Sequence, residues 1–110
     1  MNLEKFAVGV TDWSHVTAST LPGESGTVTN RRCQLGDIQL RRVDYSAGYV
    51  ADHWCSKGHI IFVVEGDLIV EHQDGRMYPL TPWMSYHIAD GDGAPHRVRS
   101  EKGASIFVVD

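Results

Sequence analysis

Residues 60–80 decide the fold, and their sequence is IIFVVEGDLIVEHQDGRMYPL. Ile60–Val64 and Asp67–His72 are short runs of β-branched and other apolar residues, which favour strands. An Asp-Gly pair at 74–75 separates the second run from Arg76–Leu80. Such a pair between two β-prone runs indicates a hairpin, because both of its residues tolerate positive φ. The stretch therefore predicts a strand followed by a β-hairpin.

The same strand-and-turn pattern continues along the rest of the chain. Thr27–Leu35 and Asp37–Ser46 form a second plausible strand pair, while Ile60–Val64 and Ser105–Val109 are apolar enough for burial on both faces. Turn residues recur about every ten residues, and only Asp12–Ser19 could hold a short helical turn. About eight or more short strands predict an all-β fold, which would be a small antiparallel barrel or jelly roll. We expect one domain over residues 1–110.

Composition excludes several classes of partner. The net charge is −4, with 10 basic and 14 acidic residues, which argues against a nucleic-acid partner because such proteins carry a basic face. No apolar run approaches the roughly 18 residues that span a bilayer, and the first residues do not resemble a signal peptide. We therefore expect a cytoplasmic protein with no membrane partner. In that compartment Cys33 and Cys55 are expected to be free or metal-bound rather than disulfide-linked.

Candidate metal ligands gather in the segment DHWCSKGH at 52–59 and in GAPH at 93–96. His53 and Cys55 are two residues apart, so they would point to one face of an extended strand. A turn near residues 56–58 would bring the next histidine back to the same point. Imidazole and thiolate are ligands for soft or borderline metals. The sequence therefore predicts a metal site at which His53, Cys55 and His59 converge, with His96 downstream as a further candidate ligand.

This arrangement resembles the first cupin motif, which is a glycine, His-x-His, three or four residues, a glutamate, six residues and a glycine. Here Gly48 precedes His53-x-Cys55, and His59 and Gly66 follow at the motif's intervals. Cys55 replaces the second histidine, His59 replaces the glutamate, and the spacing before His53 is one residue shorter than usual. The second cupin motif, Pro-x-Gly-x-x-His, is matched in part by Gly93-x-x-His96, with a glycine in place of the proline.

More narrowly, Tyr45–Ile60 resembles the small bacterial cupins named for their Asp, His, Cys and Trp motif, the DHCW group. Asp12-Trp13-Ser14 and GESG at 23–26 are similar to that group as well. The resemblance implies a double-stranded β-helix with a metal in the barrel. It implies no particular activity, because cupins include dioxygenases, isomerases, decarboxylases, sugar-binding modules and storage proteins.

The predicted ligands, three imidazoles and one thiolate, suit tetrahedral Zn²⁺ best, with Fe or Ni as alternatives. Four bound ligands would fill the zinc shell and indicate a structural site, whereas a vacancy would admit an activated water. Cys55 could instead be a buried thiol beside the metal, and His96 a hydrogen-bonded loop histidine.

Neighbouring residues allow two readings as well. Asp52 could orient a ligand imidazole or simply face solvent. Arg97 and Arg99 could hold an anionic substrate, although a solvated strand face is the simpler interpretation.

Three functions follow from this sequence. The first is a metal-binding cupin with a small-molecule pocket in its barrel. If it is an enzyme, which the sequence does not decide, it would act on a small polar or carbonyl substrate, or as an oxygenase if the metal is iron. The second is a non-catalytic ligand-binding or sensing module with a structural metal, and the third is a metal-free barrel with a redox-responsive Cys55. A homodimer is also expected, because edge strands need covering and the segment around Trp13 could pack on a partner.

Overall fold

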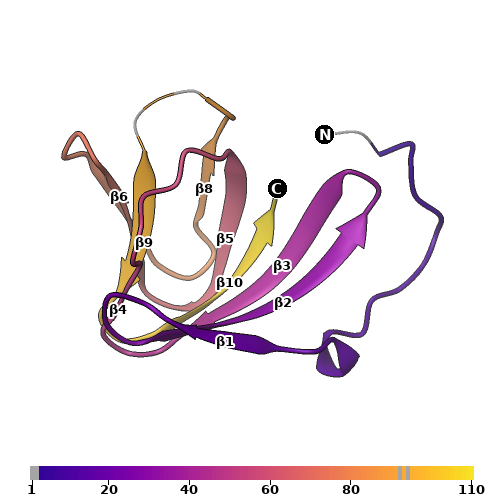
Figure 1. Ribbon diagram of the computed structural model, residues 1–110, viewed down its shortest axis with the longest axis horizontal. Coiled ribbons are helices and arrows are strands. Elements are labelled where there is room, and N and C mark those ends of the chain that lie inside the picture. The colour runs from indigo at the N-terminus through magenta and orange to yellow at the C-terminus, as the bar shows by residue number, and fades with distance from the viewer. Residues whose placement is uncertain (1–2, 92, 94) are drawn as a thin grey trace.

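The computed structural model describes residues 3–91, 93 and 95–110, and it is built almost entirely from antiparallel strands (Figure 1). The strands are β1 (Ser19–Pro22), β2 (Thr27–Leu35), β3 (Ile38–Tyr45), β4 (Tyr49–Val50), β5 (His59–Gly66), β6 (Leu68–His72), β7 (Met77–Leu80), β8 (Ser85–Ile88), β9 (His96–Ser100) and β10 (Ala104–Val109). One short 3-10 helix, η1 (Trp13–His15), lies within the predicted helical turn. The predicted all-β class is confirmed.

The strands form two sheets that face each other (Figure 1). The larger sheet has the order β1-β2-β3-β10-β5-β8, and the smaller has the order β4-β9-β6-β7. Between them lies an apolar core whose most deeply buried residues are Val43, Val63, Leu68, Val70 and Ile106. Burial of such side chains is the main favourable term in folding a barrel of this size.

The predicted strand pairs are present in the structure. β2 has the predicted bounds and pairs with β3 in an antiparallel register from Val28 opposite Tyr45 to Leu35 opposite Ile38. The predicted hairpin joins β6 to β7, with Leu68 opposite Leu80. Among the described residues, no helix is long and apolar enough to cross a membrane.

The expectation that Ile60–Val64 is buried on both faces is wrong. Ile61 and Val63 are buried in the core, but Ile60 and Val64 are 45% and 52% exposed. The reason is that only one face of the larger sheet packs against the smaller sheet. The run is uniformly apolar, yet its side chains alternate between the core and the outer surface.

Gly66 ends β5, where the chain leaves the larger sheet for the smaller one. Its φ is +83°, which is a left-handed conformation that favours glycine, and a Cβ there would collide with the backbone oxygen of Gly103. The final glycine of the first motif is thus explained by backbone geometry. Ala94 of the second motif lies outside the described residues.

Candidate metal centre

Three of the four predicted ligands come together inside the barrel. Each of Cys55, His59 and His96 offers one ligand atom, and these atoms all lie within 4.8 Å of one another. Sγ of Cys55 is 3.7 Å from Nε2 of His59. Two ligand atoms on a tetrahedral zinc ion, with bonds of about 2.0–2.3 Å, are about 3.3–3.8 Å apart. The spacing of this pair is therefore that of two ligands to one metal.

Backbone hydrogen bonds hold two of these residues side by side. The N–H of Cys55 donates to the oxygen of His96 at 2.7 Å, and the N–H of His96 donates to the oxygen of Cys55 at 2.8 Å. This antiparallel bridge lies where β9 begins. His59 is the first residue of β5 in the larger sheet. The site therefore forms where the two sheets meet.

The sulfur of Cys55 also receives a backbone hydrogen bond. The N–H of Lys57 donates to Sγ at 3.4 Å, within the turn that separates Cys55 from His59. This contact helps to fix the position of the sulfur, which would bind a metal as the thiolate. Cys33 is the other free cysteine, and its Sγ lies 3.3 Å from Oγ1 of Thr11. As predicted, neither cysteine is in a disulfide.

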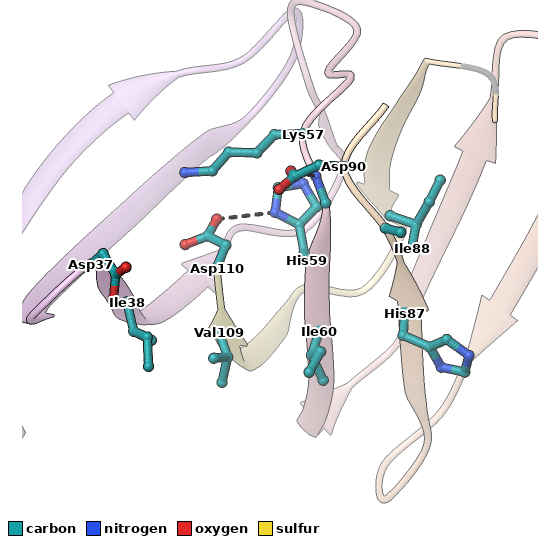
Figure 2. Close-up of a pocket in the computed structure, with 12 residues that line it drawn as sticks. Asp37, Ile38, Lys57, His59, Ile60, His87, Ile88, Asp90, Val109 and Asp110 are labelled. Carbon is teal, nitrogen blue, oxygen red and sulfur yellow. Dashed lines mark hydrogen bonds and ion pairs between the residues drawn. The ribbon is translucent and has the colours of Figure 1, made fainter. Parts of the chain in front are cut away.

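Asp110 orients the His59 ring. Its Oδ2 lies 3.0 Å from Nδ1 of His59 (Figure 2). The same oxygen lies 3.0 Å from Nη2 of Arg41, and the Asp110 side chain is almost fully buried. Burial raises the pKa of Asp110, but Arg41 and the His59 hydrogen bond outweigh this effect, so the pKa lies below its usual value. The ionised Asp110 carboxylate accepts a hydrogen bond from the N–H at Nδ1 of His59. The other ring nitrogen, Nε2, then carries the lone pair and faces Cys55. Histidines that bind metals are commonly oriented by a carboxylate in this way.

Burial also affects the imidazole itself. It lowers the pKa of His59, and the hydrogen bond and charge of Asp110 oppose this shift only in part. The neutral form, which is the form able to donate a lone pair to a metal, is thus favoured.

The structure places His53 differently from the other three residues. Its side chain is 78% exposed, and its Nδ1 lies 2.7 Å from Oδ1 of Asp52. It is not part of the group of close ligand atoms found among the described residues. The chain bends at Asp52 and His53 instead of continuing as a strand, so the expected shared face with Cys55 does not form. A role for His53 as a fourth ligand stays a prediction.

A cavity of about 410 Å³ opens beside the three clustered residues. Its walls include Tyr45 and Tyr49 as well as polar side chains from β2 and β3. Small-molecule sites commonly have volumes of about 300–1,000 Å³. A second cavity, of about 630 Å³, lies on another side of His59 and is lined in part by Lys57, Asp90 and Asp110 (Figure 2). His59 therefore borders two spaces.

Other polar residues near the site are occupied by internal contacts. Arg97 pairs with Glu24 and Glu71 and stacks 4.5 Å from the Trp54 ring centre. Arg99 lies 3.8 Å from the same Glu71 carboxylate. Because both arginines already contact carboxylates of the protein, they fit the interpretation as a solvated strand face better than that of a site for an anionic substrate.

His72 lies next to His96, on the neighbouring strand β6. It is buried, its Nε2 lies 2.8 Å from the hydroxyl of Tyr86, and the His72 and His96 rings are 5.8 Å apart. Its position next to His96 follows from the register of β6 and β9, where the two residues are opposite each other.

The comparisons with known proteins give fold-level matches. No family model matches this chain, and no curated protein matches it either. Ectoine synthase from P. lautus is 20% identical with a TM-score of 0.73, and the match covers 93% of this chain and 76% of that one. A sugar phosphate isomerase of the cupin superfamily from Silicibacter pomeroyi is 18% identical with a TM-score of 0.69, over 92% of this chain and 74% of that one.

The chain has the cupin fold. The double-stranded β-helix predicted from the motifs is confirmed by these structures. A further match is to a structure of HppE with Fe(II), which is 14% identical with a TM-score of 0.75. The match covers 93% of this chain but 59% of that chain, so this chain is much shorter than HppE. Identities this low show the fold and leave the activity to the site itself.

The Asp110 carboxylate gives the first testable prediction. We expect Asp110→Asn to weaken metal binding about 10- to 100-fold, because the amide no longer holds the His59 ring in its metal-binding tautomer. Competition with a chromogenic chelator measures the affinity. The matched control is Asp37→Asn, which removes a carboxylate that lines the neighbouring cavity without bonding to His59. Equal affinities for the parent and Asp110→Asn would contradict the orienting role.

Proposed function

We propose that this chain is a cytoplasmic, metal-dependent cupin of the DHCW group that binds a small molecule in its barrel. One observation carries the proposal: the ligand atoms of Cys55, His59 and His96 lie within 4.8 Å of one another. The same three residues line a cavity of about 410 Å³. A metal held by them would face the space in which a ligand fits.

The donor set supports a divalent metal, and zinc best. Two imidazoles and one thiolate match the ligands that zinc takes in proteins, and three protein ligands with an open position are typical of catalytic zinc sites. Iron is the alternative, because the HppE structure contains Fe(II). Iron sites in oxygenases commonly use two histidines and a carboxylate, so here a thiolate would supply the negative charge.

The position of His53 supports an open coordination site. Its imidazole is hydrogen-bonded to Asp52 and exposed to solvent, so it would have to leave that contact to act as a fourth ligand. With the fourth position open, a bound metal can act as a Lewis acid on a carbonyl or on water. The non-catalytic alternative requires that position to be filled.

Elemental analysis of the purified protein tests the ligand set. We expect about one metal ion per chain, lost or strongly reduced in Cys55→Ser and His96→Ala, since each substitution removes a ligand. Cys33→Ser is the matched control, because this second free cysteine contacts Thr11 instead of the cluster. His53→Ala should keep its metal.

The other outcomes are equally clear. Metal loss in His53→Ala would mean a four-ligand site and favour the non-catalytic module. Full occupancy in Cys55→Ser would remove Cys55 from the ligand set. A parent protein that takes up no metal after reconstitution would reject the proposal. The metal-free barrel with a redox-responsive Cys55 would then be the remaining function.

We further propose that the chain forms a homodimer. Trp13 packs edge-on against Phe107 of its own chain, with ring centres 5.8 Å apart, so it is not the free contact that the sequence suggested. Instead Val8 and Val10 are fully exposed on the N-terminal segment, which passes outside the two sheets between Lys5, next to Gly36 of the β2–β3 turn, and Thr11, next to Cys33 of β2 (Figure 1). Trp83 and Val64 are exposed beside the outer face of the larger sheet. In a dimer, the apolar side chains on the N-terminal segment of one copy would pack on the uncovered sheet surface of the other.

Light scattering at micromolar concentration measures the oligomeric state. We expect a dimer mass for the parent and a monomer mass for the double variant Val8→Asp/Val10→Asp, because charges would be buried in the contact. Met77→Asp, at an exposed apolar residue of the smaller sheet, is the control and should stay dimeric. A monomeric parent would end this proposal.

A further inference from the structure

Three polar residues of β2 and β3 face the interior of the barrel. Asn30 and Arg32 alternate inward along β2, and the register places Arg32 opposite Arg41 of β3. All three line the cavity that contains Cys55 and His59. A buried polar side chain is expensive unless it is paired or binds something. Of the three, Asn30 is buried, Arg41 is paired with Asp110, and Arg32 is exposed at the wall of the cavity.

The outer face of the same strands shows the contrast. Arg31 lies 3.3 Å and Arg42 lies 3.6 Å from oxygens of Asp44, so both outward-facing arginines have a carboxylate partner. Among the described residues, no carboxylate lies within ion-pair distance of Arg32. Arg32 is solvent-exposed at the cavity wall. It therefore presents an uncompensated positive charge to anything that enters the cavity.

Asn30 provides a second and independent sign of a ligand. It is only 7% exposed, and its Oδ1 has no hydrogen-bond partner among the described residues. Buried polar atoms are nearly always hydrogen-bonded, so an exception at a cavity wall indicates a partner that enters from outside. The amide oxygen can accept a hydrogen bond from a ligand hydroxyl or, with the amide flipped, the NH2 group can donate one to a ligand oxygen.

Arg41 connects this polar wall to the metal ligands. Its Nη2 is paired with Asp110, which in turn holds His59, while its Nε is buried without a hydrogen-bond partner in the described part of the chain. The acidic residue that lines the cavity, Asp52, is turned to His53. The cavity of an acidic protein is thus positive on the wall formed by β2 and β3.

We infer that the cavity binds a small organic anion, a carboxylate or a phosphate ester. Its anionic group lies against Arg32 and Asn30, and its other polar end reaches the Cys55, His59 and His96 cluster. A guanidinium suits this task because its planar fork donates two parallel hydrogen bonds to a carboxylate or phosphate. The metal end of this arrangement rests on the proposed function, but the anion end rests on β2 and β3 alone.

Titration calorimetry with inorganic phosphate, lactate and uncharged glycerol at constant ionic strength tests the inference on the metal-reconstituted protein. We expect phosphate or lactate to bind, glycerol not to bind, and Arg32→Gln to weaken anion binding at least about tenfold. Arg31→Gln is the matched control, because it is the adjacent arginine on the opposite face of β2. Asn30→Asp should also weaken binding, since it places a like charge beside the anion.

The two anions distinguish the classes of ligand. Binding of phosphate alone indicates a phosphorylated ligand, and binding of lactate alone indicates a carboxylate. Anion binding that is equal in Arg32→Gln and Arg31→Gln, or no stronger than glycerol binding, overturns the inference. Thermal melting of each variant shows that it is folded, and Arg32→Lys, which keeps the charge, should retain part of the affinity.

Metal content, measured in parallel, separates this inference from the proposed function. Metal-free protein that binds phosphate through Arg32 would reject the metal site and keep the anion site. Metal-loaded protein that binds neither anion would keep the metal site and reject the anion site.

Discussion

The pair of backbone hydrogen bonds between Cys55 and His96 is the constraint on which the site depends. At 2.7 and 2.8 Å, the two bonds attach the segment after β4 to the first residue of β9. Without that bridge, Cys55 would lose its backbone pairing with the smaller sheet, and its thiol would no longer be fixed beside His96. With it, the Cys55 sulfur and the His96 imidazole face the barrel interior from two backbone segments that lie side by side. His59 adds a second imidazole from the larger sheet, so the ligands join the two sheets.

The buried carboxylate of Asp110 links this cluster to the rest of the cavity. It contacts the His59 ring on one side and Arg41 on the other, each at 3.0 Å. A buried carboxylate is stable only when paired, and here each partner also has a second role. The first partner is a candidate metal ligand, and the second stands opposite Arg32 in the polar wall. The geometry thus joins the candidate metal ligands and the proposed anion-binding wall in one cavity.

Much of the fold could be predicted from local sequence patterns. β2 has its predicted bounds, and the Asp-Gly hairpin joins the predicted strands, because turn chemistry and β propensity act over a few residues. The motif spacing also identified Cys55, His59 and His96, which the structure brings together. Exposure of Ile60 was not predicted, because a uniformly apolar run does not reveal which face is covered.

The remaining parts of the site needed tertiary information. His53 and Cys55 would share a face only on an extended strand, and the bend at Asp52 and His53 removes that face. Asp110 continues the inward alternation of Ile106 and Val108, so parity in the sequence could have suggested its direction. Its contact with His59, however, depends on the pairing of β10 with β5, residues far apart in the chain. The inward direction of Arg32 depends in the same way on which face of β2 is covered.

X-ray absorption spectroscopy at the metal edge of the reconstituted protein is the most direct test of the central claim. A metal bound by Cys55, His59 and His96 should show one sulfur neighbour at about 2.3 Å for zinc, together with imidazole nitrogens at about 2.0–2.1 Å. A coordination shell of nitrogen and oxygen alone, with no sulfur neighbour, would contradict the ligand set on which this account is built.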